Sequence, residues 1–216
     1  MYILLGVSAL DNRNRTIEQN TDVLTTKTTQ KADNVFLSYL HDLVVLITGV
    51  LLVFSLLFRI VIVSGPSMNN TLVDGDWLLL LGNVLYSEPQ RGDIIVASKD
   101  LFDDGTPIIK RVIATEGQEV DIDFAAGIVY VDGEALDEPY TLTATNHDEG
   151  VNFPLTVEEG CIFVMGDNRN WSKDSRSPEI GLIDRREILG KAIFLFFPGN
   201  NGGQIEAEFD RIGVLS

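Results

Sequence analysis

The chain has 216 residues, a formal net charge of −16 and a single cysteine, Cys161. Nucleic-acid binding needs clustered lysine and arginine side chains, so the excess of acidic residues argues against a nucleic-acid partner. A lone cysteine excludes an internal disulfide and a cysteine-rich zinc site. Acidic and basic residues balance before Ser64, so the negative charge belongs to the later part of the chain, where we interpret it as a solvated surface.

Residues 1–42 are predicted to form an N-terminal tail without catalytic chemistry. The apolar stretch at its start, Met1–Leu10, is too short to span a bilayer and lacks the basic residues that begin a cleaved signal peptide. Residues 11–34 are rich in Thr, Asn, Asp and Gln, a composition typical of a flexible or weakly helical segment.

Residues 43–63 form the most hydrophobic run of the chain. As a helix, about 21 residues extend over roughly 31 Å, which matches the ~30 Å hydrocarbon core of a bilayer. The one charged residue, Arg59, lies near the far end, where a long side chain can reach the interface. The run therefore predicts a single transmembrane helix, because a buried core helix would need a larger globular body around it.

The charges beside this run indicate its orientation. Lys27 and Lys31 lie within about 20 residues of its near end, whereas Ser64–Asn83 contains neither lysine nor arginine. The positive-inside rule then places the N-terminus in the cytoplasm and residues 64–216 outside it, although Arg59 counts slightly in the opposite direction.

Residues 64–216 consist of short apolar runs separated by Gly, Asp and Pro, and no long stretch has a helical period. These runs predict strands at Trp77–Leu81, Ile94–Ala97, Ile108–Ile113, Ile128–Val131, Cys161–Val164 and Ala192–Phe196. Asp132-Gly133 between two apolar runs indicates a tight hairpin. The pattern predicts a mainly β domain with antiparallel sheets and a barrel-like body, in which a buried Cys161 thiol would be inert.

Ser67 follows the apolar run closely and could act as a nucleophile if the fold supplied a base. The two histidines are poor candidates, because His41 precedes the predicted membrane helix and His147 lies in a polar loop. A Ser-His-Asp triad, which needs a buried and oriented histidine, is therefore disfavoured.

A lysine can be the base when burial lowers its pKa from the usual value of about 10.4. Lys110 lies between Ile108 and Val112 on one face of a predicted strand, so its side chain would have apolar neighbours. From composition alone, a lysine in a strand is more often a residue at the edge or rim of a sheet, so this pattern makes a catalytic role possible without establishing it.

Five blocks, in order, resemble the bacterial type I signal peptidases (leader peptidases), membrane-anchored Ser/Lys endopeptidases that remove signal peptides from exported preproteins. The blocks are the apolar run 43–63, Ser64–Leu72, Arg91–Ile95, Ile109–Ile113 and Gly166–Arg176. The last block is the most specific, since it combines Gly-Asp-Asn-Arg with Ser, Asp, Ser and Arg at the family's intervals.

The resemblance implies that Ser67 is the nucleophile and Lys110 the general base, with Ser172 beside the Lys110 ammonium. It also implies a polar framework that holds the site, formed by Arg111, Asp167, Arg169, Asp174 and Arg176. The family further implies a mainly β catalytic domain (residues 64–216) outside the cytoplasm, with no metal and no cofactor. Its partners are the lipid bilayer and preproteins with small side chains one and three residues before the cut.

The sequence departs from the family pattern at three positions. Asn70 and Glu116 stand where proline is usual, and Gly65 cannot offer the side-chain hydroxyl that some members place in the oxyanion hole. The main-chain amide of Ser67 can still donate there. Ser64 lies one position too early to be that donor and has no assigned role.

Two alternatives differ from this interpretation. A self-cleaving, repressor-type Ser/Lys peptidase would need a DNA-binding helical region, and residues 1–40 lack the basic charge and the periodicity for one. A membrane-anchored β domain that binds an exported partner without catalysis is compatible with the departures at Asn70 and Glu116.

Overall fold

The computed structural model describes residues 36–99, 105–199 and 209–215. The chain divides into two compact units, Met1–Val53 and Phe54–Ser216. Most of the predicted tail, residues 1–35, lies outside the described residues.

One helix, Phe36–Leu57, is long and apolar enough to cross a membrane. The sequence predicted a helix at residues 43–63, whereas the observed helix begins and ends earlier in the chain. Residues Phe58–Ile62, which the prediction included in the helix, instead form strand β1, and β1 pairs with β2 (Trp77–Gly82). The β-branched residues Ile60–Ile62 favour the extended backbone, and hydropathy alone cannot separate an apolar strand from the apolar helix before it.

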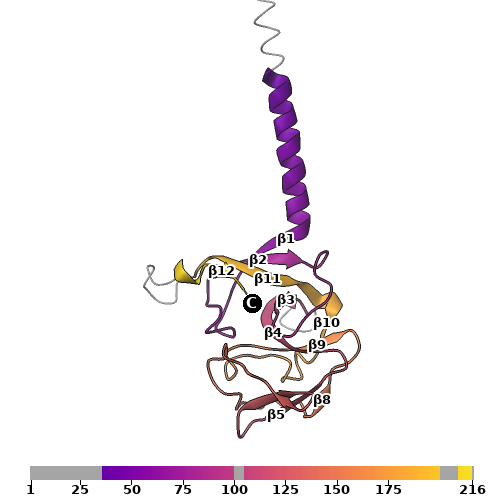
Figure 1. The fold of residues 1–216 in the computed structure, drawn as a ribbon, viewed down its shortest axis with the longest axis vertical. Helices are drawn as coiled ribbons and strands as arrows, with labels where there is room; N and C mark the ends of the chain where they lie inside the picture. Colours follow the sequence, from indigo (N-terminus) through magenta and orange to yellow (C-terminus); the bar gives the residue numbers. More distant parts are fainter. Residues whose placement is uncertain (1–35, 100–104, 200–208, 216) are drawn as a thin grey trace, which may run out of the picture. The chain divides into compact units, whose positions relative to one another are not determined.

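The second unit contains two antiparallel sheets (Figure 1). The larger, eight-stranded sheet has the order β1-β2-β11-β3-β4-β9-β10, and β12 pairs with β11. Besides β1, its strands are β2 (Trp77–Gly82), β3 (Ile94–Ala97), β4 (Ile108–Thr115), β9 (Cys161–Met165), β10 (Ile183–Asp184), β11 (Ile188–Phe197) and β12 (Gly213–Val214). Short 3-10 helices, η2 (Arg185–Glu187) and η4 (Phe209–Arg211), precede β11 and β12.

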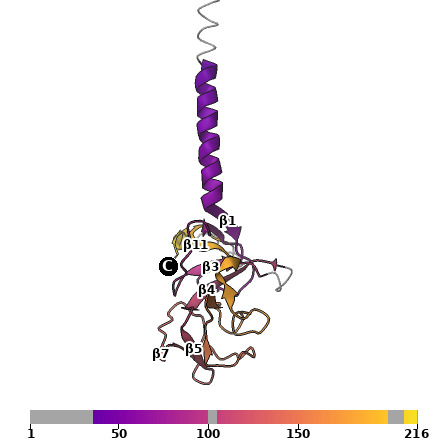
Figure 2. The same cartoon turned by 90° about the vertical axis from the view of Figure 1, so that its right-hand side faces the viewer.

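The smaller sheet has four strands in the order β7-β6-β5-β8. They are β5 (Glu119–Asp123), β6 (Ile128–Val131), β7 (Glu134–Ala135) and β8 (Leu155–Thr156). In both views β5 lies at the opposite end of this unit from β1 (Figures 1 and 2). The prediction of a mainly β domain with antiparallel sheets, curled into a barrel-like body, is confirmed, and every predicted strand is present.

The predicted hairpin at Asp132-Gly133 is also confirmed, since β6 and β7 pair on either side of it. Asp132 and Gly133 have φ angles of 54° and 79°, as a two-residue turn of the I′ type requires. The Asp132 carboxylate accepts hydrogen bonds from the Glu119 amide and the Gln118 side chain, which hold its pKa below the usual range.

Strand β4 packs against all three hydrophobic clusters of the core. Ile109 packs against the first, Ile113 belongs to the second and Val112 to the third. Full burial of one such side chain contributes about 1.5–3 kcal/mol, so β4 is firmly held. Residues Lys110–Ala114 of this strand are buried without interruption, which places two charged side chains inside the domain.

Candidate active site

Ser67 lies in the turn that connects β1 to β2. The amide of Asn69 donates to the Pro66 carbonyl (3.1 Å), and the amide of Leu72 donates to the Met68 carbonyl (2.9 Å). Met68 and Leu72 are buried in the first core cluster, so the chain is anchored immediately after Ser67. The turn therefore presents a half-buried serine on a fixed backbone.

Gly65 lets the chain enter this turn. Its φ angle is 88°, in the region that glycine adopts without strain, and its amide donates to the Asp74 carboxylate at 2.8 Å. The turn closes where the Val63 amide donates to the Asp76 carbonyl and the Gly75 amide donates to the Val63 carbonyl. Both ends of the segment that carries Ser67 are thus joined by main-chain hydrogen bonds.

Lys110 reaches Ser67 from the middle of β4. Its side chain is buried, and Nζ donates to Ser67 Oγ at 2.8 Å and to the Ile109 carbonyl at 3.0 Å. Burial lowers the pKa of Lys110 to about 8, although the carboxylates of Asp174 and Glu149 act in the opposite direction. Near pH 8, about half of such amines are neutral and able to accept a proton.

A cleft of about 520 Å³ opens beside the Ser67–Lys110 pair. Its lining is largely apolar and comes from the end of β1, the turn after it, β3 and the start of β4, including Val61, Val63, Met68 and Ile109. Ser64 also lines this cleft and is exposed. A peptide bound there would have its backbone next to the serine hydroxyl and the lysine amine.

The segment Gly166–Arg176, which follows β9, supports Ser67 directly. The Asn168 amide donates to the Ser67 carbonyl at 3.0 Å, and the Asn168 side chain donates to the Pro66 carbonyl at 3.1 Å. A Cβ atom on Gly166 would lie 2.2 Å from Ser172 Oγ and 2.4 Å from the Ser67 carbonyl oxygen, so only glycine fits. Sequence reasoning assigned no role to Asn168 or Gly166, although both stand in the most specific block.

Arg111 and Asp167 form a buried, two-pronged ion pair. Nε donates to Oδ1 at 2.9 Å and Nη2 donates to Oδ2 at 2.8 Å. The guanidinium also donates to the Gly92 carbonyl and lies 4.0 Å above the Tyr140 ring. Thr71, in the turn that carries Ser67, donates its hydroxyl to the same carboxylate, so this pair links β4, the turn and the Gly166–Arg176 segment.

Asp174 connects Arg176 to the backbone of the site. Arg176 Nε donates to Asp174 Oδ1 at 2.8 Å, while Oδ2 accepts from the Gly166 amide and the Ser172 hydroxyl, each at 2.9 Å. The resemblance implied that Ser172 orients the Lys110 amine. In the structure the Ser172 hydroxyl donates to the Asp174 carboxylate, which is a stronger acceptor than a neutral group. The Lys110 amine donates to Ser67 and to the Ile109 carbonyl.

Arg169 pairs with Glu138, a residue that sequence reasoning did not select. Nη1 donates to Glu138 Oε2 at 2.7 Å and to the Thr145 hydroxyl at 2.9 Å, and Nε donates to the Gly166 carbonyl. Burial disfavours the guanidinium charge, but the Glu138 carboxylate outweighs it and holds the pKa of Arg169 above its usual value. Glu138 lies in an irregular loop, where no periodic pattern signals its partner.

The other candidate nucleophile and the histidine of this domain, Cys161 and His147, lie on other segments than Ser67. His147 is exposed in its loop, and Cys161 is half-buried at the start of β9, where burial raises the pKa of its thiol. The exposed His147 agrees with the solvated position expected for it, whereas Cys161 is less buried than the sequence predicted. Within the described ranges, no group of three or more His, Cys, Asp or Glu side chains is arranged to hold a metal ion.

The Arg111–Asp167 geometry predicts the result of a conservative exchange. Arg111→Lys keeps the charge but loses the two-pronged contact, so we expect the free energy of unfolding to fall by about 2 kcal/mol. Urea denaturation in detergent measures this loss. The same exchange at the exposed Arg91 should change stability by less than about 0.5 kcal/mol, and equal losses at both positions would show that the paired geometry is not stabilising.

The chain was compared with known proteins. Residues 36–197 match the family described as signal peptidase, peptidase S26. The signal peptidase I of Bacillus licheniformis is 35% identical over 182 residues, which cover 81% of this chain and 95% of that protein. A probable signal peptidase I-1 of Synechocystis is 40% identical over 170 residues (72% and 82%), and signal peptidase I T of Bacillus subtilis is 35% identical over 193 residues (86% and 96%). Among solved structures, a signal peptidase I from Enterococcus faecalis matches with 30% identity and a TM-score of 0.40, covering 48% of this chain and 96% of that one.

Proposed function

The chain belongs to the signal peptidase family, peptidase S26, a family of peptidase hydrolases, and on this basis we propose that it is a membrane-anchored serine endopeptidase that removes signal peptides from exported preproteins. The observation that carries the proposal is the 2.8 Å contact between Lys110 Nζ and Ser67 Oγ. Lys110 is only 4% exposed, and its lowered pKa makes the neutral amine available near pH 8.

The proposed reaction begins with a proton transfer along this contact. Neutral Lys110 accepts the Ser67 hydroxyl proton while Oγ attacks the carbonyl carbon of the scissile peptide bond. The main-chain amide of Ser67 stabilises the oxyanion, a role in which one well-placed donor contributes about 2.7–4 kcal/mol. The carbon–nitrogen bond then breaks, and the Lys110 ammonium returns its proton to the leaving amine.

The second half of the reaction releases the signal peptide. Lys110 accepts a proton from a water molecule, whose oxygen attacks the ester carbonyl on Ser67. The carbon–oxygen bond breaks, Lys110 returns the proton to Ser67 Oγ, and the signal peptide leaves as a carboxylate. Base and nucleophile are thereby restored without a metal or cofactor.

We assign a supporting role to the polar residues around the pair. The Gly166–Arg176 segment holds the Ser67 carbonyl through the Asn168 amide, and the Arg111–Asp167 pair joins that segment to β4. Nucleophile and base must stay within a fraction of an ångström of their working positions, which requires such fixed neighbours. Ser172, Arg169, Asp174 and Arg176 act in this way through the contacts described above.

The substrate enters the apolar cleft beside Ser67. Its lining, including Val61, Val63 and Met68, suits small apolar side chains near the cut, which agrees with the family's preference for alanine one and three residues before it. A domain that only binds an exported partner would have no use for a buried amine hydrogen-bonded to a serine, and this contact favours catalysis over the binding alternative.

Replacing either member of the pair should abolish cleavage. We expect Ser67→Ala and Lys110→Met each to lower kcat/KM for cleavage of a preprotein by at least about 10³-fold, because each removes a group that acts as part of a unit. Ser87→Ala is the matched control and should stay within about twofold of wild type, since Ser87 is an exposed serine that does not line the cleft. Full activity in either of the first two variants would remove the dyad from the mechanism.

We also propose the topology of the chain in the membrane. The helix Phe36–Leu57 replaces the predicted span 43–63, so the cytoplasmic tail becomes residues 1–35 and the catalytic domain begins at β1. Lys27 and Lys31 precede the helix and favour a cytoplasmic N-terminus, whereas Arg59 follows it. Ser67 is ten positions after Leu57, so the chain keeps the proposed nucleophile within about 35 Å of the end of the span.

Protease added outside intact, sealed cells tests this topology. We expect it to digest the domain that follows the helix and to leave a protected fragment that contains the N-terminus, because a bilayer excludes the protease. A cytoplasmic control protein must stay intact in the same sample. Protection of the C-terminal domain until the membrane is opened would reverse the proposed orientation.

A further inference from the structure

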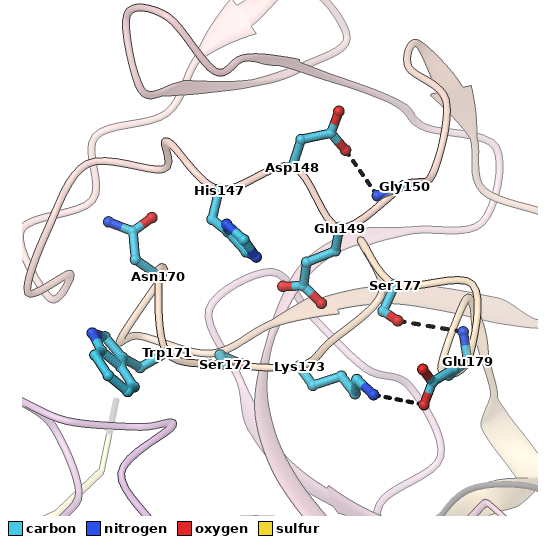
Figure 3. A pocket seen from close by; sticks show the side chains of 10 residues that line it. All are labelled: His147, Asp148, Glu149, Gly150, Asn170, Trp171, Ser172, Lys173, Ser177 and Glu179. Atoms are coloured by element: carbon cyan, nitrogen blue, oxygen red, sulfur yellow. Dashed lines mark hydrogen bonds and ion pairs between the residues drawn. The ribbon is translucent and has the colours of Figure 1, made fainter.

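A second cavity borders the Gly166–Arg176 segment. It has a volume of about 700 Å³ and is lined by residues of two loops, among them Glu149, Ser172 and Lys173 (Figure 3). Ser172 also lies against Gly166, which contacts the Ser67 backbone, so the wall of this cavity is part of the framework that holds the nucleophile. Figure 3 shows the Glu149 side chain pointing toward Ser172 and Lys173.

Glu149 is a partly buried carboxylate whose arginine partner is imperfectly aligned. Its side chain is 9% exposed, and Oε1 lies 3.1 Å from Arg176 Nη2. This oxygen nevertheless accepts no well-aligned hydrogen bond. Burial first, and then the nearby Asp174 carboxylate, raise the pKa of Glu149 to about 7, although Arg176 and a hydrogen bond from the Asp174 backbone act in the opposite direction. Glu149 therefore gains and loses its proton in the pH range where Lys110 changes charge.

Arg176 is shared between Glu149 and Asp174. Asp174 receives the aligned contacts, from Nε to Oδ1 and from Nη2 to Oδ2, each at 2.8 Å. The same Asp174 carboxylate accepts from the Ser172 hydroxyl and from the amide of Gly166, which lies against the Ser67 carbonyl. One guanidinium thus connects the cavity wall to the backbone beside the nucleophile.

The charges near the site make the proton of Lys110 and that of Glu149 interdependent, since Glu149, Asp174 and Asp167 favour the Lys110 ammonium and Arg176 opposes it. Three guanidiniums (Arg111, Arg169 and Arg176) are paired with four carboxylates (Asp167, Asp174, Glu138 and Glu149). A charged Lys110 balances this set, whereas a neutral Lys110, the form that accepts a proton, leaves one negative charge in excess. A buried excess charge is costly, and protonation of Glu149 would remove it.

We propose that Glu149 is a positioning residue for the reaction. Gain or loss of the Glu149 proton, together with the charges of Arg176 and Asp174, sets the pH range in which Lys110 is the neutral base. The inference rests on the proposed function, because it assigns a role within that reaction. Glu149 lines an open cavity, which gives its carboxyl group access to protons from solvent.

Other charged groups face Glu149. From the Gly166–Arg176 segment come Asp174, Arg176 and Lys173, and Lys110 interacts from β4. His147 and Asp148 are exposed neighbours on its own loop, and Glu179 lines the same cavity. Lys173 and Glu179 pair with each other at 2.6 Å and are 47% and 65% exposed, so water and salt screen them.

The direction of the effect follows from charge. The Glu149 carboxylate raises the pKa of Lys110. Glu149→Gln keeps the shape but removes that charge, so the pKa of Lys110 falls and more of the lysine is neutral at low pH. The acidic limb of the kcat/KM profile should move down by roughly 0.5–1 pH unit, which is a three- to tenfold gain in kcat/KM below the limb.

The test is a pH profile of preprotein cleavage by the full chain in detergent, from pH 5 to 10. We expect a lower limb for Glu149→Gln and a limb close to that of wild type for Glu149→Asp, which keeps the charge. Glu179→Gln, which removes a charge from the wall of the same cavity, is the control and should not move the limb. A Glu149→Gln limb that coincides with wild type, or that moves up, overturns the proposal.

If Glu149→Gln fails to fold, the pH profiles of wild type and of Glu149→Ala still test the proposal. Glu149→Ala should move the limb in the same direction. Fitting the acidic limb of the wild-type kcat/KM profile should require two coupled ionisations. A limb that fits a single ionisation contradicts the proposal. If wild type cleaves no preprotein, the proposed function fails and the inference fails with it; if wild type is active and its variants share one limb, the inference alone fails.

Discussion

The site depends on keeping the Lys110 amine out of water while carboxylates lie nearby. Burial in β4 disfavours the ammonium, and the acidic side chains of the Gly166–Arg176 segment and its neighbours favour it. The two effects leave the pKa of Lys110 at about 8, a value that suits the base of the proposed reaction. A fully apolar surrounding would depress the basicity further, and a solvated position would leave the lysine charged.

The same balance explains why the framework around the pair is ionic. Buried ion pairs are a weak source of stability, since apolar residues of similar size often serve as well. Here the buried guanidiniums of Arg169 and Arg176 make directional hydrogen bonds to the carbonyls of Gly166 and Arg169. These bonds fix the segment whose Asn168 amide holds the Ser67 carbonyl. The charges thus position the backbone, and they set the electrostatic environment of the lysine as well.

Much of the fold could be predicted because its signals are local. Short β-branched runs gave the central strands, and Asp132-Gly133 gave the hairpin, because each depends on a few adjacent residues. Strand β1 could not be separated from the helix before it, since Phe58–Ile62 continues the same apolar composition. Its extended backbone comes from pairing with β2, a contact that hydropathy does not express.

The candidate site, like the fold, was predicted only in part from the sequence. The Ser67 and Lys110 positions followed from family blocks, and the structure brings them into contact although they are 43 positions apart. The partners of the framework arginines were not predicted, because Glu138 and Glu149 lie in irregular loops that approach the site only through the tertiary fold. The Ser172 hydrogen bond to Asp174 was also missed, since the choice between a buried carboxylate and a lysine amine depends on geometry that spacing does not give.

The pH dependence of kcat/KM for wild-type preprotein cleavage tests the central claim most directly. Lys110 must lose its proton to act as a base, so activity should rise with pH and level off above a limb near the lysine pKa of about 8. The proposed mechanism predicts that limb and its position well below the usual lysine value. A limb near 10, the value of a solvated lysine, would contradict the desolvated base on which the proposed mechanism rests.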